Sequence, residues 1–239
     1  MALAERAPAR AVLITRPQPG AEETAARITA MGFVPILAPV LTIRRLPAML
    51  PAAVDAVVIT SRNALASLPQ TLRAVPLFAV GEATAAAARR CGFETVFSAD
   101  ADAAALADLI GCTFTSSPAR RLLHLSGKSQ GRDLARRLRE LGFVVYRRVV
   151  YQAVPEPALA EAARAALGAG SVRAALFFSA ETARSFVRLA VEAGLRDSVR
   201  STEACAIGRP AAVALEPLPW RSIRVATRPN QSELLALLQ

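Results

Sequence analysis

Several residue types are scarce in this chain, and each scarcity excludes a class of site. There is one histidine, His124, in 239 residues, which excludes a metal site built from several histidines. The three cysteines, Cys91, Cys112 and Cys205, lie far apart without a CxxC pair. This spacing predicts reduced, buried thiols rather than a disulfide scaffold or a zinc site.

Long hydrophobic runs are also missing. No apolar run approaches the roughly 18 residues that a membrane-spanning helix needs, and residues 1–10 lack the apolar stretch of a secretory signal. The sequence therefore predicts a cytoplasmic protein without a membrane association. His124 lies inside an apolar run, so we expect it in the core or at the end of a strand.

The charge is unbalanced, with 29 basic and 19 acidic residues and a net charge of +10. Such a surplus is typical of nucleic-acid binding. However, Lys128 is the only lysine, the arginines are scattered, and alanine is abundant, a composition typical of codon bias. We expect a surface that attracts some polyanion, but not a nucleic-acid groove.

The most informative feature is an internal repeat. Residues 13–33 resemble 123–143, residues 57–61 resemble 175–179, residues 78–84 resemble 205–211, and residues 106–110 resemble 234–238. The period is too long for a solenoid, so the repeat predicts two similar domains.

Within each copy, short apolar runs alternate with helical patterns. Residues 11–15 form a predicted strand, and residues 20–31 a helix that ends at Gly32; residues 121–125 and 131–141 are their counterparts. Buried strands that alternate with helices indicate the α/β class with parallel sheets.

Ligands of open α/β sheets bind beyond the carboxyl ends of the strands. Hydroxyl, glycine and basic residues gather at these positions, namely Thr15, Arg16, Ser61, Arg62, Asn63, Gly81, Thr84, Ser126, Lys128, Ser179, Gly208 and Arg209. Helix N-termini favour anions, although each junction alone is also explained by ordinary N-capping. None of these loops is a P-loop or a dinucleotide-binding motif. Together they predict an anionic ligand and no cofactor or metal.

Two further segments, residues 33–43 and 143–153, are extended and end at prolines, which suggests a pair of linkers. Strand alternation would place Val145, Arg147, Val149 and Tyr151 on one face of the second segment.

Taken together, these motifs resemble the uroporphyrinogen-III synthase family over roughly residues 11–238. The resemblance rests on the order and spacing of six segments: Ile14–Pro17, Val58–Ala64, Phe78–Thr84, Val150–Gln152, Phe177–Ser179 and Ala206–Gly208. It implies two flavodoxin-like α/β domains joined by a two-stranded linker, with the active site in the cleft between them. The implied boundaries are 1–38 plus 155–239 for the first, discontinuous domain, 39–46 and 147–154 for the linker, and 47–146 for the second domain.

The resemblance also implies a reaction. The family converts hydroxymethylbilane, a linear tetrapyrrole, to uroporphyrinogen III in tetrapyrrole and heme biosynthesis, through an azafulvene and a spiro intermediate, and inverts the last pyrrole ring. It needs no cofactor. We expect a monomer, with transient contact to the enzyme that makes the bilane.

Tyr151 matches the family tyrosine proposed as the acid, and Thr84 and Ser179 match cleft-lining positions. The other strand-end residues, together with Arg147, are expected carboxylate partners. Arg209-Pro210 departs from the threonine-containing turn that the family commonly has. This departure is what would favour the alternative, a catalytically inactive polyanion-binding or regulatory module with the same fold.

Overall fold

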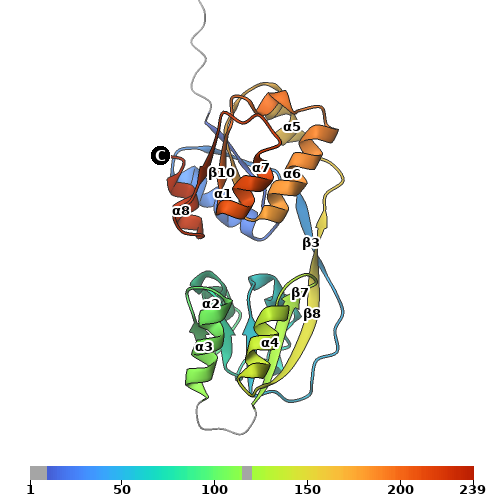
Figure 1. Cartoon of the computed structure of the whole chain (residues 1–239), viewed down its shortest axis with the longest axis vertical. Helices are drawn as coiled ribbons and strands as arrows, with labels where there is room; N and C mark the ends of the chain where they lie inside the picture. The colour runs from blue at the N-terminus through green and yellow to red at the C-terminus, as the bar shows by residue number, and fades with distance from the viewer. Residues whose placement is uncertain (1–9, 115–119) are drawn as a thin grey trace, which may run out of the picture. The chain divides into compact units, whose positions relative to one another are not determined.

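The computed structural model describes residues 10–114 and 120–239 and divides into two compact units (Figure 1). Unit 1 combines the described chain up to Thr42 with Val154–Gln239, and unit 2 is the continuous segment Ile43–Ala153. Each unit is an α/β layer structure, and the predicted class with parallel sheets is confirmed.

Unit 1 contains a five-stranded sheet in the order β2-β1-β9-β10-β11. Its strands are β1 (Ala11–Ile14), β2 (Val34–Leu37), β9 (Val172–Phe177), β10 (Glu203–Ala206) and β11 (Ser222–Val225), and neighbouring strands pair in parallel. Numbered within the unit, this is the order 2-1-3-4-5 of flavodoxin-like sheets.

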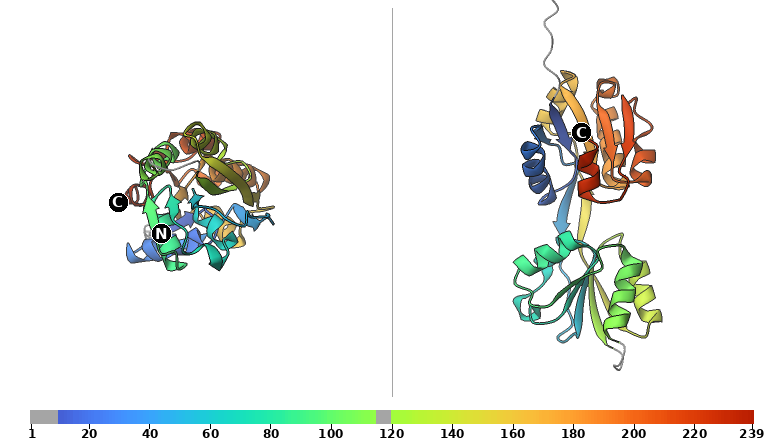
Figure 2. Two further views of the ribbon diagram at one scale, coloured as in Figure 1. Left: turned by 90° about the horizontal axis from the view of Figure 1, so that it is seen from below. Right: turned by 90° about the vertical axis from the view of Figure 1, so that its left-hand side faces the viewer.

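Helices cover both faces of the unit 1 sheet (Figure 2). They are α1 (Gly20–Ala30), α5 (Glu161–Gly168), α6 (Ala180–Glu192), α7 (Arg209–Leu215) and α8 (Gln231–Ala236), with the 3-10 turn η3 (Asp197–Val199). On one face, Ile28 of α1 and Leu234 of α8 pack against Val12 and Leu176 of the strands. On the opposite face, the ring of Phe177 contacts the rings of Phe186 and Trp220.

Unit 2 contains a six-stranded sheet in the order β3-β8-β7-β4-β5-β6. Its strands are β3 (Leu41–Arg45), β4 (Ala56–Ile59), β5 (Leu77–Ala79), β6 (Val96–Ser98), β7 (Arg121–Gly127) and β8 (Val144–Pro155). The strands from β8 to β6 pair in parallel. Two hydrogen bonds, Leu46 N–H to Val150 O and Glu156 N–H to Val40 O, show that β3 runs antiparallel to β8.

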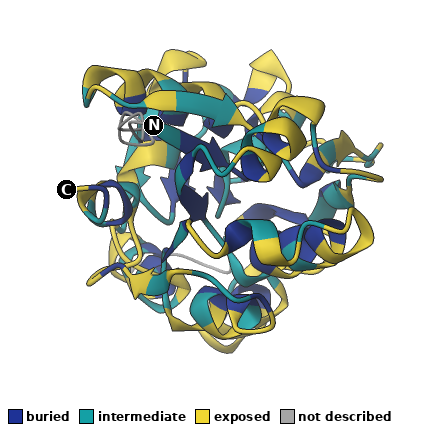
Figure 3. Cartoon of the chain, turned by 90° about the horizontal axis from the view of Figure 1, so that it is seen from above, coloured by how far each residue is buried: buried dark blue, intermediate teal, exposed yellow. Residues whose placement is uncertain are grey.

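Two apolar clusters fill the two faces of the unit 2 sheet. The helices and 3-10 turns are α2 (Glu82–Arg90), α3 (Ala103–Thr113), α4 (Arg132–Glu140), η1 (Arg62–Ser67) and η2 (Gln70–Leu72). One cluster joins the sheet to η1 and α2, and the other joins it to α3 and α4. Figure 3 colours the whole chain by burial, with buried residues on the inner strands and exposed residues on the outer faces of the helices.

The sequence repeat does not coincide with the units. The first copy supplies β1, α1 and β2 to unit 1, but its later elements, β4 to α3, lie in unit 2; the second copy is divided the other way, with β7, α4 and β8 in unit 2. In spatial order, β8-β7-β4-β5-β6 therefore corresponds to β2-β1-β9-β10-β11. Two copies of one fold have exchanged their second halves.

Two expectations from the sequence are wrong. Residues 33–43 are not one linker, because Val34–Leu37 forms β2 and pairs with β1, which leaves β3 as the strand that runs beside β8. The cysteines are not all buried: Cys205 is buried, whereas Cys91 and Cys112 are exposed free thiols near helix C-termini. Over residues 10–114 and 120–239, no helix has the length and apolarity to cross a bilayer.

Candidate functional site

The carboxyl edge of the unit 2 sheet gathers nine of the predicted site residues. Because β4, β5 and β7 pair in parallel, the residues that follow or end them lie at one edge of the sheet. These residues are Ser61, Arg62 and Asn63 after β4, Gly81 and Thr84 after β5, and Ser126 and Lys128 at the end of β7. The other two lie within β8: Tyr151 pairs with Gly127 at this edge, whereas Arg147 pairs with His124 inside the sheet and reaches the edge through its side chain.

Two of these junctions are helix N-caps, as the sequence predicts. The Ser61 hydroxyl accepts a hydrogen bond from the Asn63 N–H at 3.3 Å, and η1 begins at the next residue, Arg62. Gly81 is the extended N-cap of α2, and the space where a side chain would start is open. The first turn of α2 therefore presents N–H groups that a carboxylate could approach.

Tyr151 occupies a different position from the one that strand alternation predicts. The register of β7 and β8 shifts opposite Ser126 and Gly127, so that Gly127 pairs with Tyr151. Tyr151 consequently packs in the cluster of Val150, whereas Val145 packs on the other face. The expectation that these side chains share one face is wrong, because the bulge reverses the alternation.

Tyr151 is 4% exposed, and its ring lies directly over Gly127. A Cβ atom at Gly127 would stand 2.8 Å from the ring, so a side chain there would displace the tyrosine. The phenol hydroxyl donates a hydrogen bond to Gln130 Oε1 at 3.0 Å. The buried ring thus carries its hydroxyl to an exposed residue of the loop between β7 and α4.

Two cations flank this loop. Arg147 donates to the Gln130 carbonyl through Nε at 3.2 Å and through a terminal nitrogen at 2.7 Å. Lys128 is exposed, and its backbone N–H donates to the Tyr151 carbonyl at 3.0 Å. Burial and the nearby Arg132 and Arg139 lower the pKa of Arg147. These neighbouring positive charges favour an anionic ligand.

Ser126 and His124 lie beneath the loop and are fully buried. Within the described chain, no protein atom hydrogen-bonds the Ser126 hydroxyl or either ring nitrogen of His124. The prediction of a core histidine is confirmed. Ser126 has no exposed surface, so it cannot contact a ligand without a local rearrangement.

The carboxyl edge of the unit 1 sheet holds the remaining predicted residues. Thr15 is fully buried at the end of β1, and its hydroxyl donates to the Leu176 carbonyl at 2.6 Å. It is not an N-cap, because α1 begins at Gly20. The Arg16 guanidinium lies 4.3 Å from the centre of the Phe178 ring and donates to Gln231 Oε1 at 3.2 Å. Arg16 therefore ties α8 to the strand edge.

Ser179 and Gly208 begin the helices that follow β9 and β10. Ser179 forms a capping box with Thr182 at the start of α6. Gly208 is the extended N-cap of α7, in which the exposed Arg209 and then Pro210 are the first residues. Proline in the first turn removes an N–H that has no helical partner, so it leaves α7 intact.

Two residues at these edges, Gln130 and Gln231, were not predicted from the sequence. Gln130 accepts a hydrogen bond from the Tyr151 hydroxyl, and Gln231 contacts Arg16 from a helix more than two hundred residues away in sequence. Both are isolated polar residues outside any motif, and their positions depend on tertiary packing. Among the described residues, no three His, Cys, Asp or Glu side chains gather as a metal site requires.

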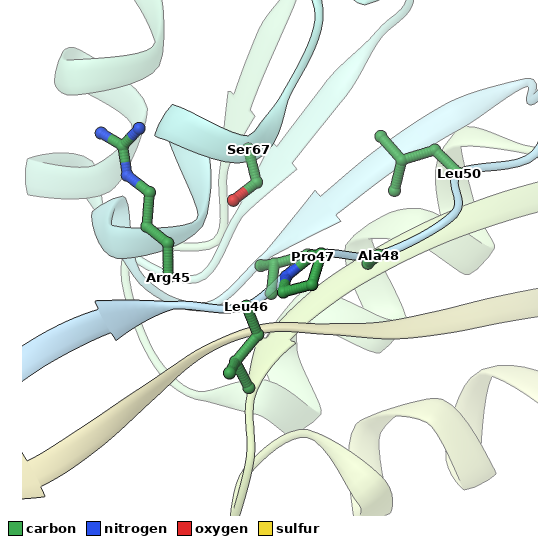
Figure 4. A pocket seen from close by; sticks show the side chains of 7 residues that line it. Arg45, Leu46, Pro47, Ala48, Leu50 and Ser67 are labelled. Carbon is green, nitrogen blue, oxygen red and sulfur yellow. The ribbon is translucent and has the colours of Figure 1, made fainter.

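A separate hollow of about 400 Å³ lies elsewhere in unit 2 (Figure 4). Its lining residues are Arg45, Leu46, Pro47, Ala48, Leu50, Ser67 and Val150. None of the predicted site residues lines it.

A family model supplies the first comparison. The model for uroporphyrinogen-III synthase HemD matches residues 22–236, which is most of the chain. No curated protein sequence matches at a significant level.

Solved structures supply the second comparison. The crystal structure of uroporphyrinogen-III synthetase from Helicobacter pylori matches with a TM-score of 0.63 and 19% identity over 96% of this chain and 98% of that one. A mutant uroporphyrinogen III synthase from Thermus thermophilus matches with a TM-score of 0.49 and 21% identity, over 95% and 97% of the two chains. At this identity the Helicobacter pylori match shows a shared fold.

Proposed function

Since this chain belongs to the uroporphyrinogen-III synthase family, we propose that Tyr151 is its proton donor and that basic residues at the strand ends bind the substrate carboxylates. The enzyme is a lyase of tetrapyrrole biosynthesis. It cyclises hydroxymethylbilane to uroporphyrinogen III and inverts the last pyrrole ring. The family match over residues 22–236 is the observation that carries this activity.

The first chemical step is loss of the hydroxymethyl oxygen. A pyrrole pushes its electron pair toward the carbon, the carbon–oxygen bond breaks, and the oxygen leaves as water once it has gained a proton. A phenol is a weak acid with an ordinary pKa of about 10, and a weak acid of this kind can supply that proton. The azafulvene that remains is then attacked by the terminal ring.

The position of Tyr151 supports this role. Its ring is held by the core and by Gly127, while its hydroxyl reaches the exposed loop at Gln130. A buried ring whose hydroxyl contacts an exposed loop residue gives the acid a fixed orientation, and a fixed orientation lowers the entropic cost of proton transfer.

We assign carboxylate binding to charged side chains near the strand ends and to the helix N-termini that follow the strands. In unit 2 the candidates are Lys128, Arg147, Arg62 and Asn63, with the α2 N-terminus at Gly81 and Thr84. In unit 1 they are Arg209, Arg16 and the α6 N-terminus at Ser179, with Gly208 beside them. A substrate that bears carboxylates on every ring gains from several weak contacts of this kind, because each removes one unpaired charge.

Monomeric state, cytoplasmic location and hand-over of the bilane from the enzyme that makes it remain predictions. Free thiols at Cys91 and Cys112 fit a reducing compartment.

The test is a coupled assay with Tyr151→Phe. Hydroxymethylbilane is generated in situ, the products are oxidised, and the type I and type III isomers are separated. We expect Tyr151→Phe to lower the rate of type III formation by about 100-fold, the lower end of general acid catalysis. The phenylalanine keeps the ring that packs over Gly127, so the fold is retained.

Tyr146→Phe is the matched control, because these are the two tyrosines of the chain, and we expect it to leave the rate unchanged. If Tyr151→Phe were as active as the wild type, Tyr151 would not be the acid. If the folded wild-type protein gave type I alone, the inactive module would replace the enzyme.

A further inference from the structure

We propose that Gln130 is a positioning residue for Tyr151: its side-chain amide holds the phenol proton before substrate binds and then, by rotating, directs that proton to the departing hydroxyl. The inference rests on the proposed role of Tyr151. It concerns a residue outside the motifs from which the family resemblance was drawn.

The direction of the hydrogen bond between Tyr151 and Gln130 keeps the phenol proton away from a substrate. The Tyr151 hydroxyl donates its one proton to Gln130 Oε1 at 3.0 Å. While that bond lasts, the proton points at the amide and not at a substrate. An amide, however, carries an acceptor on one side and two donors on the other. Rotation about the last side-chain bond brings Nε2 to the phenol oxygen.

After rotation the proton can be transferred. Nε2–H donates to the phenol oxygen, and the phenol O–H turns to donate to the hydroxymethyl oxygen of the substrate. The carbon–oxygen bond breaks, water leaves, and the phenolate that forms accepts the Nε2–H bond. A hydrogen bond to a charged acceptor is stronger than one to a neutral acceptor, so the amide stabilises the product of proton transfer.

The backbone of Gln130 is fixed, which leaves the side chain as the moving part. Its carbonyl accepts from Arg147 at 2.7 and 3.2 Å, and its N–H donates to the Gly127 carbonyl at 3.1 Å. Two residues earlier in the loop, the Lys128 N–H donates to the Tyr151 carbonyl. Gln130 itself is an exposed residue, so its amide has room to turn.

The loop also packs closely against the buried residues beneath it. Gly131 has a φ of 77°, and a Cβ atom there would stand 2.6 Å from the His124 ring and 2.9 Å from Ser126 Cβ. The loop therefore cannot move toward the sheet, and the distance between the Gln130 backbone and the Tyr151 ring is set.

Two substitutions separate positioning from simple support. Gln130→Leu removes both donor and acceptor. Gln130→Glu keeps an acceptor for the phenol proton but offers no donor at neutral pH. If Gln130 only supported the ring, Gln130→Glu would be more active than Gln130→Leu. The proposal predicts that Gln130→Glu is the less active variant, because its carboxylate keeps the phenol O–H directed away from the substrate.

We expect the rate of type III formation to fall about tenfold in Gln130→Leu, a fraction of the full effect of a general acid, and further in Gln130→Glu. Activity of Gln130→Glu relative to wild type should recover as the pH approaches the carboxyl pKa of about 4.3, because a protonated carboxyl again has a donor. Gln70→Leu, on the exposed 3-10 turn η2 of the same unit, is the matched control.

A spectroscopic titration reports on the contact without turnover. In a Tyr146→Phe background, Tyr151 is the sole tyrosine, and its ionisation is followed by ultraviolet absorbance. We expect both substitutions to raise the phenol pKa, Gln130→Glu more than Gln130→Leu, because a carboxylate disfavours a nearby phenolate.

Double substitutions complete the test. In a Tyr151→Phe background, either change at Gln130 should have no additional effect on the rate. An additional loss there, or higher activity of Gln130→Glu than of Gln130→Leu at neutral pH, would overturn the proposal. A fully active Tyr151→Phe would overturn the proposed acid, and this inference with it. An impaired Tyr151→Phe with the reversed order at Gln130 would overturn the inference alone.

Discussion

At the scale of single residues, His124 shows that an uncharged, buried side chain lies beneath the loop of the candidate site. The imidazole is fully buried on β7, and in the described chain no protein atom pairs with its nitrogens. Burial, and then the cations Arg147 and Arg139, lower its pKa to about 4. The ring is therefore uncharged at neutral pH and does not repel the arginine that holds the Gln130 loop.

This pKa predicts a specific loss of stability in acid. The unfolded histidine has a pKa near 6.5 and binds a proton more readily than the folded one. Above pH 6.5 the histidine is neutral in both states and does not weaken the fold. As the pH falls from 6.5 toward 4, only the unfolded state gains the proton, so the free energy of unfolding decreases. Denaturant unfolding between pH 7 and pH 4 should show a decline in the free energy of unfolding, of which about 3 kcal/mol comes from His124.

His124→Leu supplies the comparison. Leucine cannot be protonated, and it removes a polar group that lacks partners, so the variant should fold and lose this part of the pH dependence. An equally steep decline in the variant would assign the acid sensitivity to other groups, such as Asp55, whose pKa is lowered mainly by a hydrogen bond from the Arg121 backbone.

Single residues also mark the limit of reading the site from sequence. Lys128 stands out because its charge suits anion binding, and Tyr151 stands out because it matches the family tyrosine. Gln130 does not, since an isolated glutamine in a loop has no pattern around it. Arg147 and Tyr151 were expected on one face because alternation assumes a regular strand, and the bulge opposite Gly127 depends on the partner strand.

At the scale of elements, helix N-termini at the strand ends are the recurrent feature. Ser61, Gly81, Ser179 and Gly208 each begin a helix or 3-10 turn, as expected from residue type. Ile14 and Gly127 end their strands without such a junction, because several residues intervene before α1 and α4. Local sequence predicts a cap well, whereas the length of an intervening loop depends on packing.

The capping box of α6 gives a measurable contribution. The Thr182 N–H donates to the Ser179 hydroxyl at 3.1 Å, and the Ser179 N–H donates to the Thr182 hydroxyl at 3.2 Å. Ser179→Ala should lower the free energy of unfolding by about 1 kcal/mol, measured in denaturant at pH 7. Ser179→Asn, which keeps a capping oxygen, should retain most of that stability. Equal losses in both variants would show that the hydroxyl does not act as a cap.

At the scale of the whole molecule, the repeat and the units divide the chain differently. The repeat was visible in sequence and correctly indicates two related α/β folds. It could not show which halves associate, because both copies carry the same strand and helix patterns and either pairing would bury a similar core. Only the family resemblance pointed to a discontinuous first unit.

The exchange predicts which fragments fold. Thr42 and Val154 lie opposite each other in the antiparallel pair of β3 and β8, as the bond from Glu156 N–H to the Val40 carbonyl shows. Replacing residues 43–153 with an Asn-Gly turn should therefore close unit 1 as a hairpin. We expect a cooperative unfolding transition by circular dichroism. Residues 1–114, one sequence repeat, should show none, because they contain only two of the five strands of the unit 1 sheet and four of the six strands of the unit 2 sheet. The reverse outcome would make the repeat the folding unit.

The insertion of unit 2 within unit 1 also has a consequence for synthesis. The ribosome delivers the amino end first, and domains generally fold as units when their residues are complete. The unit 2 segment, Ile43–Ala153, is complete before any residue of β9, β10 or β11 has been made. During that interval, β1 and β2 lack the strand that pairs with β1 on its other side. The nascent chain thus carries a finished inner unit and an open parallel edge, which closes only when the last third of the protein is released.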